Sequence, residues 1–325
     1  MPYPQPIEQQ KEEFDIFRNI FSVASGVWRI KDIFVNMYIV STDTGWVLVD
    51  AGLKTSCGKI RNLAAKLFGA ESRPDAIVLT HAHFDHVGSL KVLAEEWDVP
   101  VLAHRMEIPY LTGQSSYPPP DPTVGGGIMV YMSWAFPRKP VDLGGRVVPF
   151  APDGSISAMP GWRSIHTPGH TPGHVSFYRE EDGCLIAGDA FVTTDQRQAS
   201  AVATQRREMH GPPPYFTPDW RAAAASVKEL ARLKPAIMAT GHGRSFYGSR
   251  GQQSLQKLAR QFYALAVPKH GRYIPEPALA DENGVYYVPE IGRYQKKVYA
   301  LSALAILGIL TLMIAGGTMT RKRVK

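Results

Sequence analysis

The chain has 325 residues, of which 44% are hydrophobic and 20% are charged, which excludes a disordered, coiled-coil or collagen-like protein. The formal net charge is +7, but six of the basic residues lie in 296–325, where no acidic residue occurs, so 1–295 is nearly neutral. No nucleic-acid partner is therefore expected. The two cysteines, Cys57 and Cys184, stand in no CxxC spacing, which excludes a disulfide scaffold and a thiolate zinc finger.

Residues 1–24 form a polar N-terminal extension that begins proline-rich and shows no secretory signal. A meander of strands then gives way to alternating strands and helices, with strands predicted at 26–30, 33–40, 46–50, 76–80 and 101–103 and helices at 59–68 and 90–97. Further strands are predicted at 161–166, 175–178, 184–187 and 237–240, and further helices at 219–233 and 252–266. This pattern predicts one α/β catalytic domain over 25–266, followed by a linker at 267–297.

Residues 105–147 interrupt the alternation. Prolines 118–120 and glycines 125–127 predict a long irregular segment. The segment also carries Tyr117, Tyr131, Trp134 and Phe136, so it is a candidate apolar lid over a binding site.

The C-terminal part differs from the rest of the chain. Residues 298–320 contain no charge over 23 positions, which is long enough for a helix to cross the hydrocarbon core of a membrane. A transmembrane helix is predicted there, with a basic tail at 321–325. Basic residues flank both ends, so the positive-inside rule does not decide the orientation. Because no export signal precedes it, the expected location is a membrane, with a single C-terminal anchor and the catalytic domain in the cytoplasm.

The strongest chemical signal is a HxHxDH motif directly after a predicted apolar strand, Thr80-His81-Ala82-His83-Phe84-Asp85-His86. Alternate residues of an extended chain point to one side, so His81 and His83 can bind a single ion. Asp85 and His86 are adjacent and must diverge unless the chain turns. Four such ligands cannot all saturate one catalytic ion that keeps an open position, so two metal ions are the natural interpretation.

Further candidate ligands follow other predicted strands. The turn-rich stretch Thr167-Pro168-Gly169-His170-Thr171-Pro172-Gly173-His174 offers His170 or His174. Gly188-Asp189-Ala190 and Gly241-His242-Gly243 each follow an apolar strand. Each of these candidates lies at a strand end.

With Asp50 in Leu48-Val49-Asp50-Ala51-Gly52, this ordered set of motifs resembles the metallo-β-lactamase superfamily over about residues 25 to 265. The resemblance implies a four-layer αββα sandwich with the metals between the sheet edges. The predicted fold class is therefore an α/β protein, a four-layer αββα metallo-β-lactamase sandwich followed by a C-terminal transmembrane helix.

The resemblance also assigns roles to the motif residues. It implies that one metal is bound by His81, His83 and His170, and a second by Asp85, His86 and His242. Asp189 would bridge the two metals. Asp50 and His174 would orient the ligands through hydrogen bonds without binding a metal.

The expected activity is that of a dinuclear metal-dependent hydrolase that cleaves a small carboxyl ester, thioester or lactone by a metal-bridging hydroxide. Asp85 is the expected catalytic proton shuttle. Two divalent ions are expected, with Zn²⁺ favoured and iron or manganese as alternatives. Asp189 stands where many zinc β-lactamases carry Cys, and His83 stands where diiron flavoproteins carry Glu, so the chain resembles the glyoxalase II-like branch.

Two other functions stay open. One is a mononuclear iron enzyme similar to persulfide dioxygenases, which would not need His242. The other is a non-catalytic membrane sensor that binds metal, and the intact ligand set counts against it because structural metal sites are closed. A membrane partner through the C-terminal helix is expected in either case.

Overall fold

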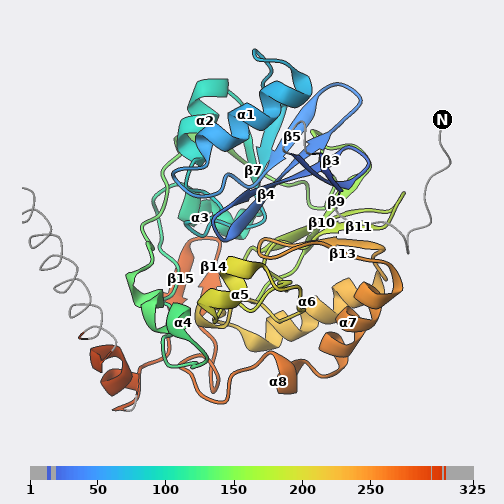
Figure 1. Cartoon of the computed structure of the whole chain (residues 1–325). Helices are drawn as coiled ribbons and strands as arrows, with labels where there is room; N and C mark the ends of the chain where they lie inside the picture. The colour runs from blue at the N-terminus through green and yellow to red at the C-terminus, as the bar shows by residue number, and fades with distance from the viewer. Residues whose placement is uncertain (1–12, 16–19, 294, 302–303, 305–325) are drawn as a thin grey trace, which may run out of the picture.

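The computed structural model describes residues 13–15, 20–293, 295–301 and 304, and its main feature is a pair of β-sheets (Figure 1). The first sheet, in spatial order, contains β1 (Glu13–Asp15), β2 (Ile20–Ala24), β3 (Val27–Asp32), β4 (Val35–Ser41), β5 (Trp46–Val49), β6 (Ala76–Val78), β7 (Val101–Ala103) and β8 (Val147–Pro149). The second has the order β13 (Phe246–Tyr247), β12 (Ile237–Ala239), β11 (Cys184–Ile186), β10 (Val175–Arg179) and β9 (Trp162–His166). A separate hairpin consists of β14 (Leu279–Asp281) and β15 (Gly284–Tyr287).

The described part of the chain also contains α-helices. They are α1 (Cys57–Phe68), α2 (Leu90–Trp97), α3 (Ile108–Leu111), α4 (Ile128–Met132), α5 (Ala199–Thr204), α6 (Trp220–Arg232), α7 (Gly248–Arg260) and α8 (Phe262–Leu265). Figure 1 shows α1 and α2 beside the first sheet and α6 and α7 beside the second, with the sheets between them. The layers are therefore α, β, β and α.

The alternation of side chains along each strand explains why the sheets are buried on both faces. In β4, Met37 and Ile39 join the core shared with α1 and α2, whereas Tyr38 and Val40 join the core between the sheets. In β12 of the second sheet, Ile237 and Ala239 belong to the inter-sheet core and Met238 to the core shared with α6 and α7. Three apolar layers thus hold four layers of secondary structure together.

Helix α6 shows how the sequence defines the outer layer. The carboxylate of Asp219 caps its start by accepting hydrogen bonds from the backbone N–H groups of Arg221 and Ala222. Ala223, Val227 and Leu230 recur at helical spacing and are buried against the second sheet. The opposite face carries the charged side chains.

Most predicted elements match the structure in type and place, and the departures have local causes. The predicted helix at 252–266 begins earlier, at Gly248, and is divided at Gln261 into α7 and α8. The irregular segment 105–147 contains the short helices α3 and α4, and it ends in β8, which pairs in parallel with β7. Elements this short bury too few residues for their periodicity to be visible in the sequence.

The predicted transmembrane helix is corrected by the structure. Among the described residues no helix is long and apolar enough to cross a membrane, because a span needs about 20 consecutive apolar residues in helical form. Of the predicted range, only 298–301 and 304 are described, and the remainder lies outside the described residues. Within that short helical stretch, Tyr299 donates a hydrogen bond to the carbonyl of Pro120 in the body of the protein, at 2.7 Å. The layered α/β part of the predicted fold class is confirmed. The predicted transmembrane helix and the membrane location that depended on it are withdrawn.

The stretch predicted as a linker contacts the catalytic domain. Tyr273 is buried and donates to the carbonyl of Pro119 at 2.6 Å. In the β14–β15 hairpin, the backbone N–H of Val285 donates to the hydroxyl of Ser115 at 3.1 Å. The boundaries of the predicted chain divisions stay a prediction, but 271–287 clearly packs against 115–121.

Candidate metal centre

The HxHxDH motif lies in the loop that leaves β6 at the edge of the first sheet. The chain turns after His83, because the backbone N–H groups of His86 and Val87 both donate to the carbonyl of His83, at 2.9 and 3.1 Å. This turn sends the adjacent side chains of Asp85 and His86 toward the same space as His81. Without the turn, the side chains of these two adjacent residues would point in different directions.

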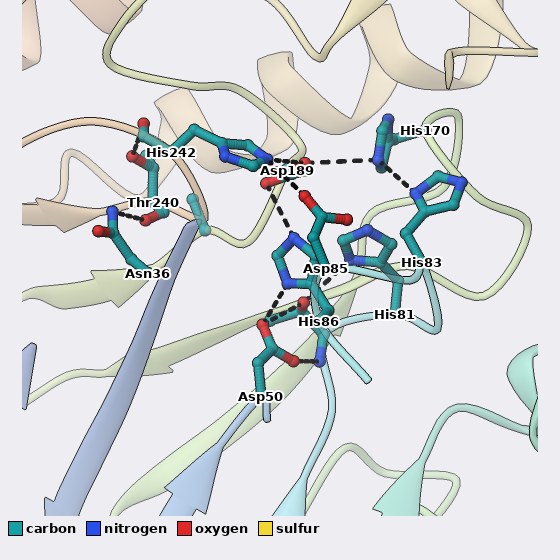
Figure 2. Close-up of polar contacts among 12 residues, drawn as sticks. Asn36, Asp50, His81, His83, Asp85, His86, His170, Asp189, Thr240 and His242 are labelled. Atoms are coloured by element: carbon teal, nitrogen blue, oxygen red, sulfur yellow. Dashed lines mark hydrogen bonds and ion pairs between the residues drawn. The ribbon is translucent and has the colours of Figure 1, made fainter. Parts of the chain in front are cut away.

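The other three loops bring their side chains to the same point (Figure 2). His170 comes from the turn between β9 and β10, Asp189 from the loop after β11, and His242 from the loop after β12. All these strands end at one edge of the sandwich, so residues that are far apart in sequence converge. The seven predicted ligands (His81, His83, Asp85, His86, His170, Asp189 and His242) are all buried.

The donor atoms fall into three overlapping groups whose members lie within 4.8 Å of one another. They are His81, His83 and His170; His81, His86 and Asp189; and Asp85, His86 and His242. The first and third groups share no residue. Asp189 lies between them, with Oδ2 at 3.5 Å from His170 Nε2 and 3.0 Å from His242 Nε2.

The residues fit divalent metals by a direct structural criterion. His81 Nε2, His86 Nε2 and Asp189 Oδ1 are buried and lack a hydrogen-bond partner among the described residues. Unpaired polar atoms are costly in a protein interior, and a metal ion satisfies them. Nitrogen and carboxylate oxygen donors are the set that zinc and similar ions prefer.

The electrostatics favour positive charge at His86, beside Asp50 and Asp189, and disfavour it at His83. Burial lowers the pKa of His86, but the carboxylates of Asp50 and Asp189 outweigh it and raise the pKa to about 10. Burial raises the pKa of Asp189, yet the nearby imidazoles of His242 and His86 bring it well below its usual range. By contrast, burial and then the neighbouring imidazole of His86 lower the pKa of His83 to about 3.

Asp50 holds the HxHxDH loop in place through its carboxylate. Its carboxylate accepts from the backbone N–H and the hydroxyl of Thr80, both at 2.8 Å, and lies 2.8 Å from His86 Nδ1. Donation from Nδ1 leaves the other ring nitrogen of His86 for a metal. Asp50 has a left-handed backbone (φ 60°), which costs a residue other than glycine roughly 1–2 kcal/mol.

His174 lies outside the three donor groups. Its Nε2 accepts a hydrogen bond from the backbone N–H of Asp189 at 2.9 Å, and its Nδ1 is paired with the hydroxyl of Thr167. Gly188 is required beside it, because a Cβ there would lie 2.6 Å from His174 Nε2. His174 is therefore hydrogen-bonded to the backbone of Asp189, and its orienting role stays a prediction.

Glu107 was not predicted and connects two ligand loops. One carboxylate oxygen accepts from the backbone N–H of Ala82, between two histidines of the motif, and from the hydroxyl of Tyr117. The other accepts from the hydroxyl of Thr171 and the backbone N–H of Gly173, both at 2.8 Å. Burial outweighs these four donors and raises the pKa of Glu107 to about 7. The sequence shows no motif around this residue that could have revealed its role.

Asn36 was also missed and holds the His242 loop. Its amide nitrogen donates to the carbonyls of Thr240 and Gly243 at 2.8 and 2.7 Å, while its amide oxygen accepts from Arg29. His242 Nδ1 donates to the carbonyl of Phe34 at 2.7 Å, so Nε2 faces Asp189. Gly241 must be small, because a Cβ would lie 2.0 Å from Asp189 Oδ1.

Comparison with known proteins identifies the family. The model of the metallo-β-lactamase superfamily matches residues 30–242. The chain is 41% identical over 248 residues to the probable metallo-hydrolase YflN of Bacillus subtilis (strain 168), which covers 75% of this chain and 94% of the relative. The chain belongs to the metallo-β-lactamase superfamily. It is a metal-dependent hydrolase of that superfamily, as predicted.

Other superfamily members support the same assignment. The probable metallo-hydrolase YybB of Bacillus subtilis (strain 168) is 25% identical over 209 residues, which is 64% of this chain and 80% of the relative. A crystal structure of a metallo-β-lactamase family protein from Thermus thermophilus superposes with a TM-score of 0.52 at 22% identity, covering 75% of this chain and 81% of the other. That likeness shows the shared fold.

Proposed function

We propose that the chain is a dinuclear hydrolase, with zinc as its ion, that cleaves a carboxyl ester, a thioester or a lactone. The observation that carries the proposal is the pair of donor groups that share no residue, with Asp189 between them. Structural metal sites are closed by four protein ligands. Here each group offers three, and the further carboxylate, Asp189, lies between the groups and would be shared, so neither ion has four ligands of its own.

Some residues of the site would bind the metal ions, and others hold the ligand loops in place. His81, His83 and His170 would hold one ion, Asp85, His86 and His242 the other, and Asp189 would contact both. When bound, such ions supply Lewis acidity and make water a nucleophile near neutral pH. Asp50, Glu107, Asn36 and His174 keep the ligand loops in place through buried hydrogen bonds, so the donors do not need to reorganise during the reaction.

Asp85 is the proposed proton carrier. Its carboxylate lines the cavity next to the donor cluster, with Oδ2 3.6 Å from His242 Nε2. In hydrolysis the oxygen of water bonds to the carbonyl carbon and the bond to the leaving oxygen or sulfur breaks. Asp85 would accept the proton that water releases and return one to the leaving group.

Gln196 is a second polar group in this cavity. It is buried, lines the space beside Asp189, and its Nε2 has no hydrogen-bond partner within the described part of the chain. A buried amide donor of this kind is available to the carbonyl oxygen of a substrate. Gln196 is therefore proposed to orient the carbonyl toward the metal centre.

The test begins with the purified full chain, freed of metal by chelation and then reloaded with one metal at a time. We expect about two equivalents of Zn²⁺ to bind, with hydrolysis of ester, thioester or lactone probes appearing only after reloading. Binding of a single iron together with thiol-dependent oxygen uptake would contradict the dinuclear hydrolase. Metal binding without turnover of any carboxyl probe would contradict the substrate class.

A further inference from the structure

Aromatic rings close the space directly above the donor cluster. Its lining combines metal-centre residues with Phe34, Phe84, Phe136 and Phe216, and with Met129 and Tyr215. Asp85 and Asp189 are the charged carboxylates in this lining, and both belong to the donor cluster. Apart from the donor cluster, Gln196 and the hydroxyl of Tyr215, the described walls of this space are apolar.

Phe136 occupies the middle of these rings. It stacks on Phe84 with ring centroids 5.5 Å apart and contacts Phe216 at 5.9 Å. Phe216 in turn lies 4.8 Å from the imidazole of His83. Phe136 comes from the segment 124–140, which contains α4, whereas Phe84 belongs to the HxHxDH motif itself. A ring from the interrupting segment is therefore inserted beside the metal ligands.

The remaining space is too small for a substrate. Its volume is about 10 Å³, which is the room of about one water molecule. A larger cavity of about 400 Å³ lies on the other side of Gln196 and Pro213, which line both spaces. Its rim includes the exposed residues Leu265 and Lys269, so this larger cavity opens to solvent.

We propose that the substrate carries an uncharged, apolar acyl group about the size of a phenyl ring, which binds between Phe84 and Phe216 in the place that Phe136 fills in this structure. This inference rests on the proposed hydrolase function and names its substrate class. Burial of the acyl group against these rings supplies the binding free energy. A charged acyl group is disfavoured between these rings, because the lining of this space contains no lysine or arginine; Arg138 and Lys139 line the neighbouring cavity instead.

The test uses a series of 4-nitrophenyl esters that share one leaving group. The acyl groups are acetyl, butyryl, hexanoyl, phenylacetyl and succinyl, the last with a free carboxylate. We expect kcat/KM of the zinc-loaded full chain to rise by up to about fourfold per added methylene from acetyl to hexanoyl. The succinyl ester should be at least about tenfold poorer than the butyryl ester. A flat series, or a preference for the succinyl ester, would overturn the proposal.

The variant Phe136→Ala tests whether Phe136 blocks the acyl site or lines it, because the two roles change KM in opposite directions. Removing the ring frees the acyl site, so KM for the hexanoyl and phenylacetyl esters should fall about threefold or more while KM for the acetyl ester stays within about twofold. A rise in KM for all esters would show that Phe136 merely lines the site. Tyr131→Ala, an exposed ring of the same segment, is the matched control. Phe136→Leu should lie between wild type and Phe136→Ala, and it serves if the alanine variant folds poorly.

A binding measurement separates this proposal from the proposed function. Phenylacetate and hexanoate, the product acids, are titrated calorimetrically into the zinc-loaded chain beside acetate and succinate. Binding of phenylacetate at least about tenfold tighter than acetate, with a negative heat-capacity change, supports the apolar acyl site even if no ester is turned over. Equal affinities would overturn it even if esters are hydrolysed.

Discussion

The ligand loops and the segment 124–140 face the same metal centre, but different interactions hold them. The loops are tied by buried polar contacts, with four donors on Glu107 and three contacts on Asp50. The segment rests on ring contacts of Phe136, on the buried side chain of Val130 and on a hydrogen bond from Gln198 to the carbonyl of Gly126. It leaves Ile128, Tyr131 and Met132 exposed by 40–52%. Directional hydrogen bonds place catalytic atoms accurately, whereas ring packing allows a segment to move and to accept different shapes.

The largest effect is expected from removing the residue between the two donor groups. Asp189→Ala should lower metal-dependent turnover on the order of a thousandfold or more, because it removes the carboxylate that lies between the two groups. Metal content measured by mass spectrometry should fall with it, while the far-ultraviolet circular dichroism stays native. His83→Ala should behave in the same way. Retained turnover in either variant would refute the ligand assignment.

Glu107 tests whether the hydrogen bonds of the loops matter for the metals. Glu107→Gln places an amide NH₂ among four donors and leaves donors unpaired, so zinc affinity should fall about 10- to 100-fold and stability by about 1–3 kcal/mol. Competition with a chromogenic chelator and urea unfolding measure the two effects. The exposed carboxyl of Glu95 on α2 provides the control variant, Glu95→Gln. If Glu107→Gln and Glu95→Gln bind zinc equally tightly, the hydrogen bonds of Glu107 contribute to folding and not to metal affinity.

Gln196 lies where the two regions meet. Gln196→Met keeps the length and shape of the side chain but removes its amide donor, so kcat/KM should fall about tenfold for every ester probe. The bound zinc should remain unchanged, because Gln196 belongs to none of the donor groups. A loss confined to apolar esters would instead place Gln196 in acyl recognition.

Hydrogen exchange compares the mobility of the two regions directly. Backbone amides of 128–136 should exchange at least about tenfold faster than those of 81–87, because the segment's ring contacts open at a lower free energy. Chelation of the metals should accelerate exchange in 81–87 and leave 128–136 nearly unchanged. Equal protection of both regions would contradict a segment that moves to admit substrate.

The smallest effect concerns pH. His104 and His166 stack with centroids 4.1 Å apart, and burial, followed by the imidazole of His166, lowers the pKa of His104 to about 4. A histidine whose pKa is lower in the folded state contributes stability above its unfolded pKa near 6.5, and this is lost as the pH falls through about 4. His104→Phe keeps the stack without the titration, so the free energy of unfolding of the metal-free variant should fall less than that of wild type between pH 6.5 and 4. Parallel curves would contradict this.

The donor residues could be found from the sequence because they stand in short motifs directly after apolar strands. The pairs His81–His83 and Asp85–His86 needed no tertiary information beyond a turn. Glu107 and Asn36 could not be found in this way, because their partners are backbone groups of distant loops, such as Gly173 and Thr240. A carboxylate or amide acquires such a role only when the fold brings those groups to it.

The C-terminal segment 298–320 is a case in which the prediction from sequence was wrong. An uncharged run of residues meets the length criterion for a membrane helix in sequence alone, but the structure shows no such helix in the part of the chain that it describes. Hydropathy indicates whether a segment is apolar enough to enter lipid. It contains no information on tertiary contacts such as the hydrogen bond from Tyr299 to the carbonyl of Pro120.

The sequence by itself therefore determined the family, the layered α/β fold and the candidate ligands, because strand periodicity and ligand spacing are local properties. Only the tertiary structure decided that Glu107 ties two loops together, that Asn36 holds the His242 loop, and that Phe136 reaches the metal centre. These facts depend on how strand ends from two sheets converge. That convergence is set by the packing of the whole domain, which no local pattern contains.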